Sequence, residues 1–210
     1  MAGFCFDIIF YGNFLLIVRI VDHLFLKTAY NPGGFLSVGL MGVTCGVFFW
    51  LGGFLSLFAL KRISALAIQL HGFVLIALTF VILAISKIYL LNEWWPVLML
   101  TYSLMYLFAG FGPGPMTYLM PSLLFSGNLS SPVTGLIAAI GKVGAIIGII
   151  VAHSFYSEIS SLMFIFAAIS ILGAGSTFLL LNARFLSRKS SLGYEPLNQS
   201  DQTETETNPA

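Results

Sequence analysis

Six long apolar stretches account for most of this 210-residue chain and leave few folds open to it. Each is close to the roughly 20 residues that an α-helix needs to cross a lipid bilayer. Only 8% of the residues are charged, whereas a soluble domain carries about one quarter charged residues. The sequence therefore predicts an all-α membrane protein with six transmembrane helices, at about 3–21, 35–60, 63–85, 97–118, 133–153 and 160–182.

The ends of this 1–182 domain are expected in the cytoplasm, because an even number of helices returns the chain to the side on which it began. Cytoplasmic loops are enriched in Lys and Arg. Five basic residues fall on the side of the chain ends: Lys61, Arg62, Arg184, Arg188 and Lys189. Three fall on the opposite side: Arg19, Lys27 and Lys87. Residues 183–210 are too polar to pack and are predicted to be a disordered cytoplasmic tail.

The fourth apolar stretch contains a cluster of residues that interrupt helices. Gly110, Gly112, Pro113, Gly114 and Pro115 lie within six positions. Proline removes a backbone donor and glycine weakens a helix, so we expect a kink or an unwound turn that lets the helix flex. In a membrane, irregular backbone is tolerated only where it faces protein or a water-filled cavity.

A single lysine interrupts the fifth stretch. Lys142 lies near the middle of residues 136–152, which are otherwise wholly apolar. A charge at the centre of a membrane-spanning helix costs on the order of 3 kcal/mol, and such a residue usually faces a partner, a cavity or a ligand. Asp7 and Tyr11 stand four positions apart in the first stretch, so they share one helix face.

Three interpretations of these residues remain open. Asp7 and Lys142 form a structural ion pair between helices, Asp7 simply lies close to the membrane interface, or Asp7, Tyr11 and Lys142 together bind an anionic solute. Glycines flank the lysine at Gly141, Gly144 and Gly148, and their spacing is typical of close helix–helix packing. The sequence shows no catalytic constellation, no metal-ligand spacing and no cofactor motif, so neither an enzyme nor a metal site is predicted. The net charge of +1 gives no indication of a nucleic-acid partner.

Three motifs resemble the phosphate:proton symporters of the major facilitator superfamily. The opening Phe6–Asn13 resembles the start of that family's seventh helix, and Ile68–Phe73 resembles the start of its ninth. Gly141–Ile147, which contains Gly-Lys-Val-Gly-Ala-Ile, resembles its eleventh. The resemblance implies the C-terminal half of such a transporter, helices seven to twelve. It also implies that Asp7, Tyr11 and Lys142 occupy positions that contact phosphate in the family.

The chain departs from the family's pattern at several positions. A tryptophan of the seventh helix falls at Gly3, and an asparagine that binds phosphate in the tenth helix falls at Gly114. The charged loop between the eighth and ninth helices falls at Lys61–Leu66, where one acid and two bases are missing. Two functions from different classes therefore remain. The first is a proton-coupled half-transporter for phosphate or an organic acid in the plasma membrane, completed by a second six-helix half or by a homodimer partner. The second is a degenerate accessory membrane protein that does not transport.

Overall fold

The structure is a computed structural model, and it describes the chain except for residues 16, 18–31, 90–94, 126–129, 156–157 and 193–210. The described residues form α-helices and short turns, with no strand among them. The helices are α1 Ala2–Leu15, α3 Pro32–Ala59, α4 Ala65–Tyr89, α5 Trp95–Phe111, α6 Pro113–Leu124, α7 Ser130–Ser154 and α8 Ile159–Leu192. The predicted all-α fold is thereby confirmed.

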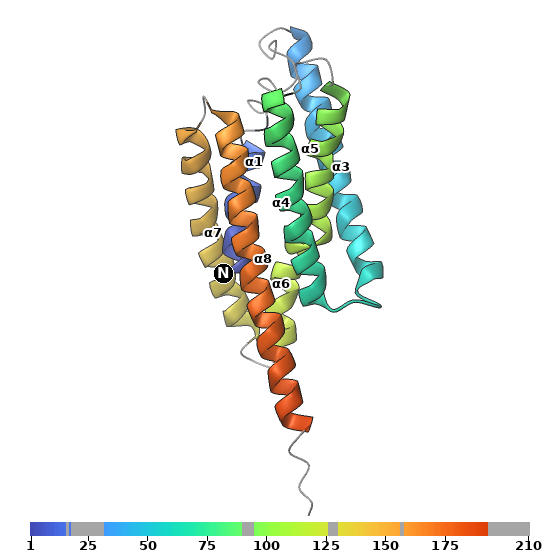
Figure 1. Ribbon diagram of the computed structural model, residues 1–210, viewed down its shortest axis with the longest axis vertical. Helices are drawn as coiled ribbons and strands as arrows, with labels where there is room; N and C mark the ends of the chain where they lie inside the picture. The colour runs from blue at the N-terminus through green and yellow to red at the C-terminus, as the bar shows by residue number, and fades with distance from the viewer. Residues whose placement is uncertain (16, 18–31, 90–94, 126–129, 156–157, 193–210) are drawn as a thin grey trace, which may run out of the picture.

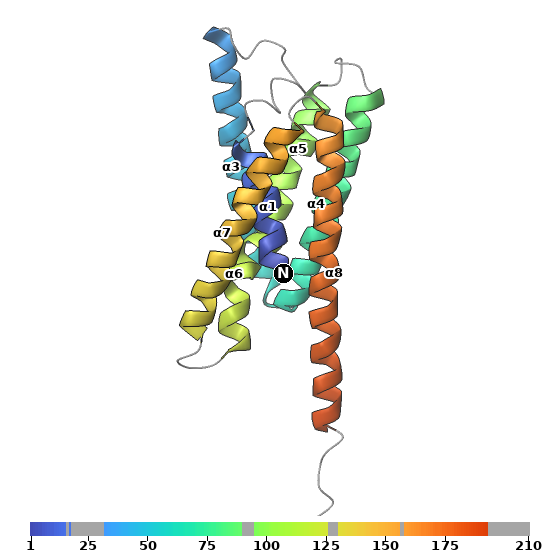
Figure 2. The same cartoon turned by 90° about the vertical axis from the view of Figure 1, so that its left-hand side faces the viewer.

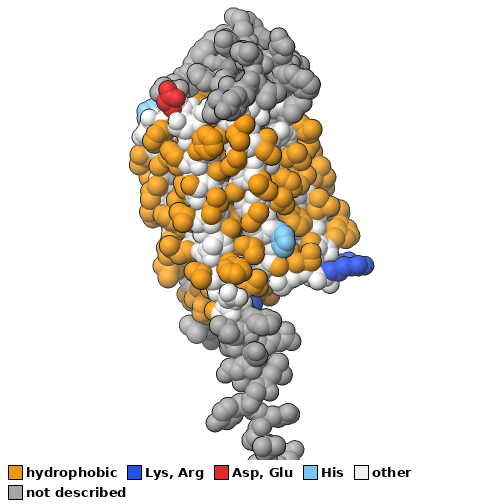
Figure 3. All heavy atoms as spheres, in the orientation of Figure 1, with side chains coloured by type: hydrophobic (Ala, Val, Ile, Leu, Met, Phe, Trp, Pro, Cys, Tyr) orange, Lys and Arg blue, Asp and Glu red, His pale blue; other side chains and the backbone are white. Residues whose placement is uncertain are grey.

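Four of the described helices are long and apolar enough to cross a membrane: Val38–Ala59, Ala65–Ser86, Ser130–Ser154 and Ile159–Arg184. Helix α1 runs beside them, and α5 and α6 follow one another and form a sixth segment with a break in it (Figures 1 and 2). These six segments run alternately up and down, as expected for a membrane half-bundle. Apolar side chains cover the middle of the visible surface, and Lys or Arg side chains lie at its lower end (Figure 3). The chain is therefore a multi-pass membrane protein.

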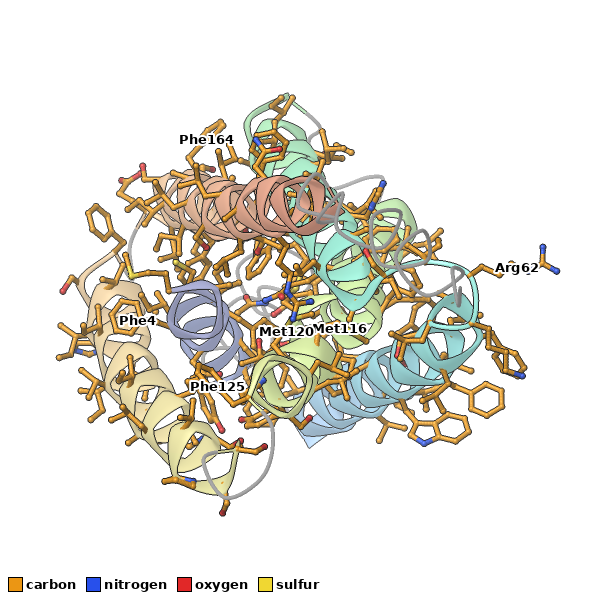
Figure 4. All side chains as sticks on the ribbon, turned by 90° about the horizontal axis from the view of Figure 1, so that it is seen from below. Phe4, Arg62, Met116, Met120, Phe125 and Phe164 are labelled. Atoms are coloured by element: carbon orange, nitrogen blue, oxygen red, sulfur yellow. The ribbon has the colours of Figure 1, made fainter. Side chains whose placement is uncertain are left out.

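Helix α1 lies inside the bundle, against α7 and α8 (Figure 4). On the other side, α3 packs on α5, and α4 lies between α5 and α8. The main core contains the fully buried rings of Phe73, Phe80 and Phe166 together with that of Tyr102. A smaller core joins α4 and α6, where Met116 and Met120 point toward the centre in Figure 4, while Arg62 extends away from the bundle.

The fourth predicted segment, 97–118, is divided between α5 and α6 at Gly112. Pro113 begins α6, where its missing N–H leaves no helical bond unmade. Gly112 lies directly against Gly72 of α4, and a methyl group on either residue would clash with the other helix. The break predicted from the glycines and prolines is therefore present, and it lies in direct contact with α4.

Several helices end beyond their predicted positions, and α6 and α8 extend the furthest. Helix α6 reaches Leu124 although Pro121 stands within it and cannot donate to the carbonyl of Thr117. Helix α8 continues to Leu192, past the end predicted at 182, and the backbone of residues 183–192 is helical. The rest of the predicted tail, and the end of the first predicted segment at 21, lie outside the described residues.

Candidate functional site

The lysine of α7 reaches α1. Lys142 Nζ donates a hydrogen bond to the Tyr11 hydroxyl over 2.5 Å. The same nitrogen is 4.4 Å from the centre of the Tyr11 ring, so the ammonium lies at the hydroxyl end of the ring rather than over its face. Lys142 is exposed at the surface of the bundle, and Tyr11 is half-buried. The cation therefore has a neutral partner and keeps donors free for a second one.

Asp7 lies one helical turn before Tyr11 and points at the same part of α7. Its side chain is only 6% exposed, and one carboxylate oxygen lies directly against Gly141. No ion pair within 4 Å joins Asp7 to Lys142 or to another described residue, although the two charges interact across α1 and α7. Of the alternatives left open by the sequence, a direct ion pair is therefore not seen within 4 Å, and Lys142 donates a hydrogen bond to Tyr11.

Three glycines of α7 form the contact surface between α1 and α7, which we call the seam. Gly141, Gly144 and Gly148 are all buried on the side of α7 that faces α1. A methyl group at Gly144 would meet the Phe4 carbonyl oxygen at 2.7 Å, and one at Gly148 would overlap the carbonyl of Ile8. Because the two backbones approach this closely, the short side chain of Asp7 and the hydroxyl of Tyr11 both reach the α7 surface beside Lys142.

A pocket of about 460 Å³ lies between α3 and the α5–α6 break. Its walls include Gly110, Gly114 and Pro115 of the break, three of the residues predicted to let this helix flex. Tyr118 lines the pocket from α6 and lies within electrostatic range of Lys142. The irregular backbone of α5–α6 therefore faces a cavity, the kind of surrounding in which a membrane protein tolerates it.

Comparison with curated proteins identifies a group of relatives. The chain is 33% identical over 147 residues, or 69% of its length, to the putative inorganic phosphate transporter 1-13 of Oryza sativa subsp. japonica. It is 28% identical over 194 residues, or 85% of its length, to the inorganic phosphate transporter PHO84 of Saccharomyces cerevisiae. The chain is a partial homologue of inorganic phosphate transporters. The resemblance that the motifs indicated is thereby confirmed.

A third relative of this phosphate transporter homologue is the low affinity inorganic phosphate transporter 4 of Lotus japonicus, 29% identical over 63% of the chain. The chain spans only 26% to 32% of the length of these three relatives. No model of a protein family matches the sequence. Among the described residues, no group of three His, Cys, Asp or Glu side chains gathers as metal ligands do.

Sequence reasoning missed a second polar group in this phosphate transporter homologue. Asn13 of α1 is fully buried and accepts a hydrogen bond from the Tyr102 hydroxyl of α5 over 3.1 Å. Its amide nitrogen lies 3.9 Å from the sulfur of Met105. Tyr106, one turn after Tyr102, is also buried, and its hydroxyl has no hydrogen-bond partner among the described residues. The signal that could have indicated this cluster is the amide residue Asn13 within an apolar stretch, because a buried amide needs hydrogen-bond partners.

Proposed function

We propose that the chain works as one half of a secondary active transporter for a small anion, with inorganic phosphate and organic acids as the candidate solutes. The observation that supports this most directly is the hydrogen bond between Lys142 and Tyr11, with Asp7 beside them on α1. An exposed lysine on an apolar helix is costly unless something offsets its charge. A bound anion supplies that charge.

Each of the three residues has a distinct role in this proposal. Lys142 attracts the anion and donates hydrogen bonds, and the Tyr11 hydroxyl holds the ammonium in place and orients the solute. Asp7 is nearly buried and makes no ion pair within 4 Å with a described residue, so it is the candidate for accepting a hydrogen bond from a protonated oxygen of the solute or for carrying the coupled proton. The relatives are named as transporters, and we infer transport rather than catalysis.

Transport by rocking requires two halves that alternate around a solute at the middle of the membrane. We propose that a second six-helix half, or a second copy of this chain, completes the site across the exposed side of Lys142. The plasma membrane is the proposed location, with both ends of the chain in the cytoplasm. The turn between α3 and α4, which contains Lys61 and Arg62, lies at the end of the bundle toward which the last turns of α8 extend, in keeping with that orientation (Figure 1).

Uptake of radiolabelled phosphate into proteoliposomes tests the proposal. The full chain is reconstituted, and an inward proton gradient is imposed. We expect uptake that depends on the gradient and is abolished by Lys142→Gln. Lys61→Gln is the matched control, because Lys61 is exposed in the turn after α3, where its ammonium lies 5.4 Å from the Phe58 ring centre. Equal uptake by both variants and the unaltered chain would show that Lys142 does not bind the transported anion.

The second candidate is an accessory membrane protein that keeps the fold without transport. The altered loop at Lys61–Leu66 favours it, because the family's pattern there has an acid and two bases that this chain replaces. In that case phosphate uptake stays at the level of empty liposomes, and Lys142→Gln changes only the thermal stability. The same reconstitution therefore separates the two functions.

A further inference from the structure

The pocket beside the α5–α6 break has walls suited to an apolar molecule. Phe49, Trp50, Phe54 and Leu57 of α3 form one side. Gly110, Gly114 and Pro115 of the break form the other side, and Tyr118 lines the pocket from α6. The volume of about 460 Å³ falls in the range of roughly 300–1,000 Å³ that is common for organic ligands. A phosphate ion, with five heavy atoms, is small by comparison, since one water molecule takes up about 30 Å³.

Aromatic contacts join this pocket to the Lys142 site. The Phe10 ring lies 5.6 Å from the neighbouring Tyr11 ring and 5.4 Å from the Phe49 ring. Phe49 in turn lies against Gly114. On the α6 side, Tyr118 lines the pocket and lies within electrostatic range of Lys142. The Phe10 ring therefore lies between Tyr11 of the Lys142 site and Phe49 of the pocket wall.

The apolar wall is unsuited to a fully hydrated ion. Inorganic phosphate has oxygens on every side, and a side that meets hydrocarbon loses hydrogen bonds to water without replacement. Among the side chains that line the pocket, only those of Trp50 and Tyr118 carry a hydrogen-bonding group. An apolar body in the same place would instead gain from leaving water, because the gain is proportional to the apolar surface removed.

From this arrangement we propose that the solute is an organic anion with an apolar body, such as an aryl phosphate monoester. The anionic head binds Lys142 and Tyr11, and the ring lies between Trp50 and Gly114. The inference rests on the proposed anion site and adds the class of solute. Charge complementarity with Lys142 at one end distinguishes this occupant from a lipid tail or a neutral apolar molecule.

Calorimetric titration of the full chain in nanodiscs tests the class of solute with three probes. Phenyl phosphate is expected to bind at least about tenfold more tightly than inorganic phosphate, because its ring leaves water. Benzyl alcohol, which has the ring without the charge, is expected to bind more weakly than phenyl phosphate. Lys142→Gln is expected to remove the binding of both anions. Equal affinities for the two phosphates, or equal affinities for phenyl phosphate and benzyl alcohol, would overturn the inference.

A matched pair of leucines on α3 tests the position of the ring. Leu57 lines the pocket and is 60% exposed, whereas Leu55 is 49% exposed and lies outside it. Leu57→Ala and the stronger Trp50→Ala are expected to weaken phenyl phosphate binding without changing the affinity for inorganic phosphate. Leu55→Ala is expected to change neither. Equal effects of the two leucine variants would place the ring elsewhere and overturn the inference.

The results also distinguish this inference from the proposed function. If inorganic phosphate binds in a Lys142-dependent way and phenyl phosphate binds no better, the anion site stands and the inferred solute class is wrong. If neither anion binds the full chain, both are wrong.

Discussion

The Asp7 carboxylate of α1 lies in the space that a side chain at Gly141 of α7 would need. The acid and the glycine are therefore complementary, and the residue after this glycine is Lys142. The direction in which the Asp7 carboxylate points therefore depends on how closely α1 and α7 approach each other.

Gly141→Ala is expected to displace Asp7 with little loss of stability. The added methyl group overlaps the end of a short side chain, which can rotate away, and it meets no backbone atom of α1. If Asp7 takes part in anion binding, phosphate uptake should fall markedly while the thermal midpoint in detergent changes by only a few degrees. Unchanged uptake would mean that the position of the Asp7 carboxylate does not matter for transport.

Gly148→Ala, two turns later on the same helix, is expected to act in the opposite way. Its methyl group would overlap the backbone carbonyl of Ile8, which cannot rotate away, so α1 and α7 must separate. Overpacking of this kind typically costs about 1–3 kcal/mol. Denaturant unfolding in micelles measures the change in the free energy of unfolding.

Gly135→Ala is the control for this comparison, because Gly135 also lies in α7 and a methyl group there meets nothing within 4 Å. Alanine favours a helix over glycine, so this variant should gain up to about 1 kcal/mol. Similar losses from Gly135→Ala and Gly148→Ala would contradict the assignment of the seam.

The sequence predicts the helices better than it predicts the contacts between them. Hydropathy indicates the helices because a bilayer imposes their length and requires every backbone group to be bonded within them. The spacing of Asp7 and Tyr11 likewise predicts their common face. Which of the two meets Lys142 depends on how α1 is rotated and how closely α7 approaches, and no single helix encodes that. The bond from Tyr102 to Asn13 was missed for the same reason, since its two residues are 89 positions apart.

Tyr11→Phe is expected to weaken anion binding while leaving the fold intact. The ring and its contact with Phe10 remain, but Lys142 loses the acceptor that holds its ammonium. A hydrogen bond to a charged group typically contributes about 1.5–3 kcal/mol, of which a solvent-exposed contact such as this one retains only part. We therefore expect a several-fold rise in the phosphate concentration for half-maximal uptake.

Tyr118→Phe is the comparison for this variant, because Tyr118 is 50% exposed and forms no hydrogen bond with Lys142. Its effect on inorganic phosphate uptake should be smaller than that of Tyr11→Phe. If the two variants are indistinguishable, the Tyr11 hydroxyl has no special part in holding the lysine.

The two buried tyrosines of α5 give a final prediction, because they differ in one hydrogen bond. The Tyr102 hydroxyl donates to Asn13, whereas the Tyr106 hydroxyl has no partner among the described residues. Tyr102→Phe leaves a buried amide oxygen without its donor, which typically costs about 1–3 kcal/mol. Tyr106→Phe removes a polar atom that is buried without a bond, so it should be neutral or stabilising.

Both substitutions keep the rings, which lie 5.6 Å apart, so packing is nearly constant between them. Denaturant unfolding of the two variants in the same micelles therefore isolates the hydroxyl groups. A loss of stability from Tyr106→Phe as large as that from Tyr102→Phe would show that the Tyr106 hydroxyl is bonded in the membrane.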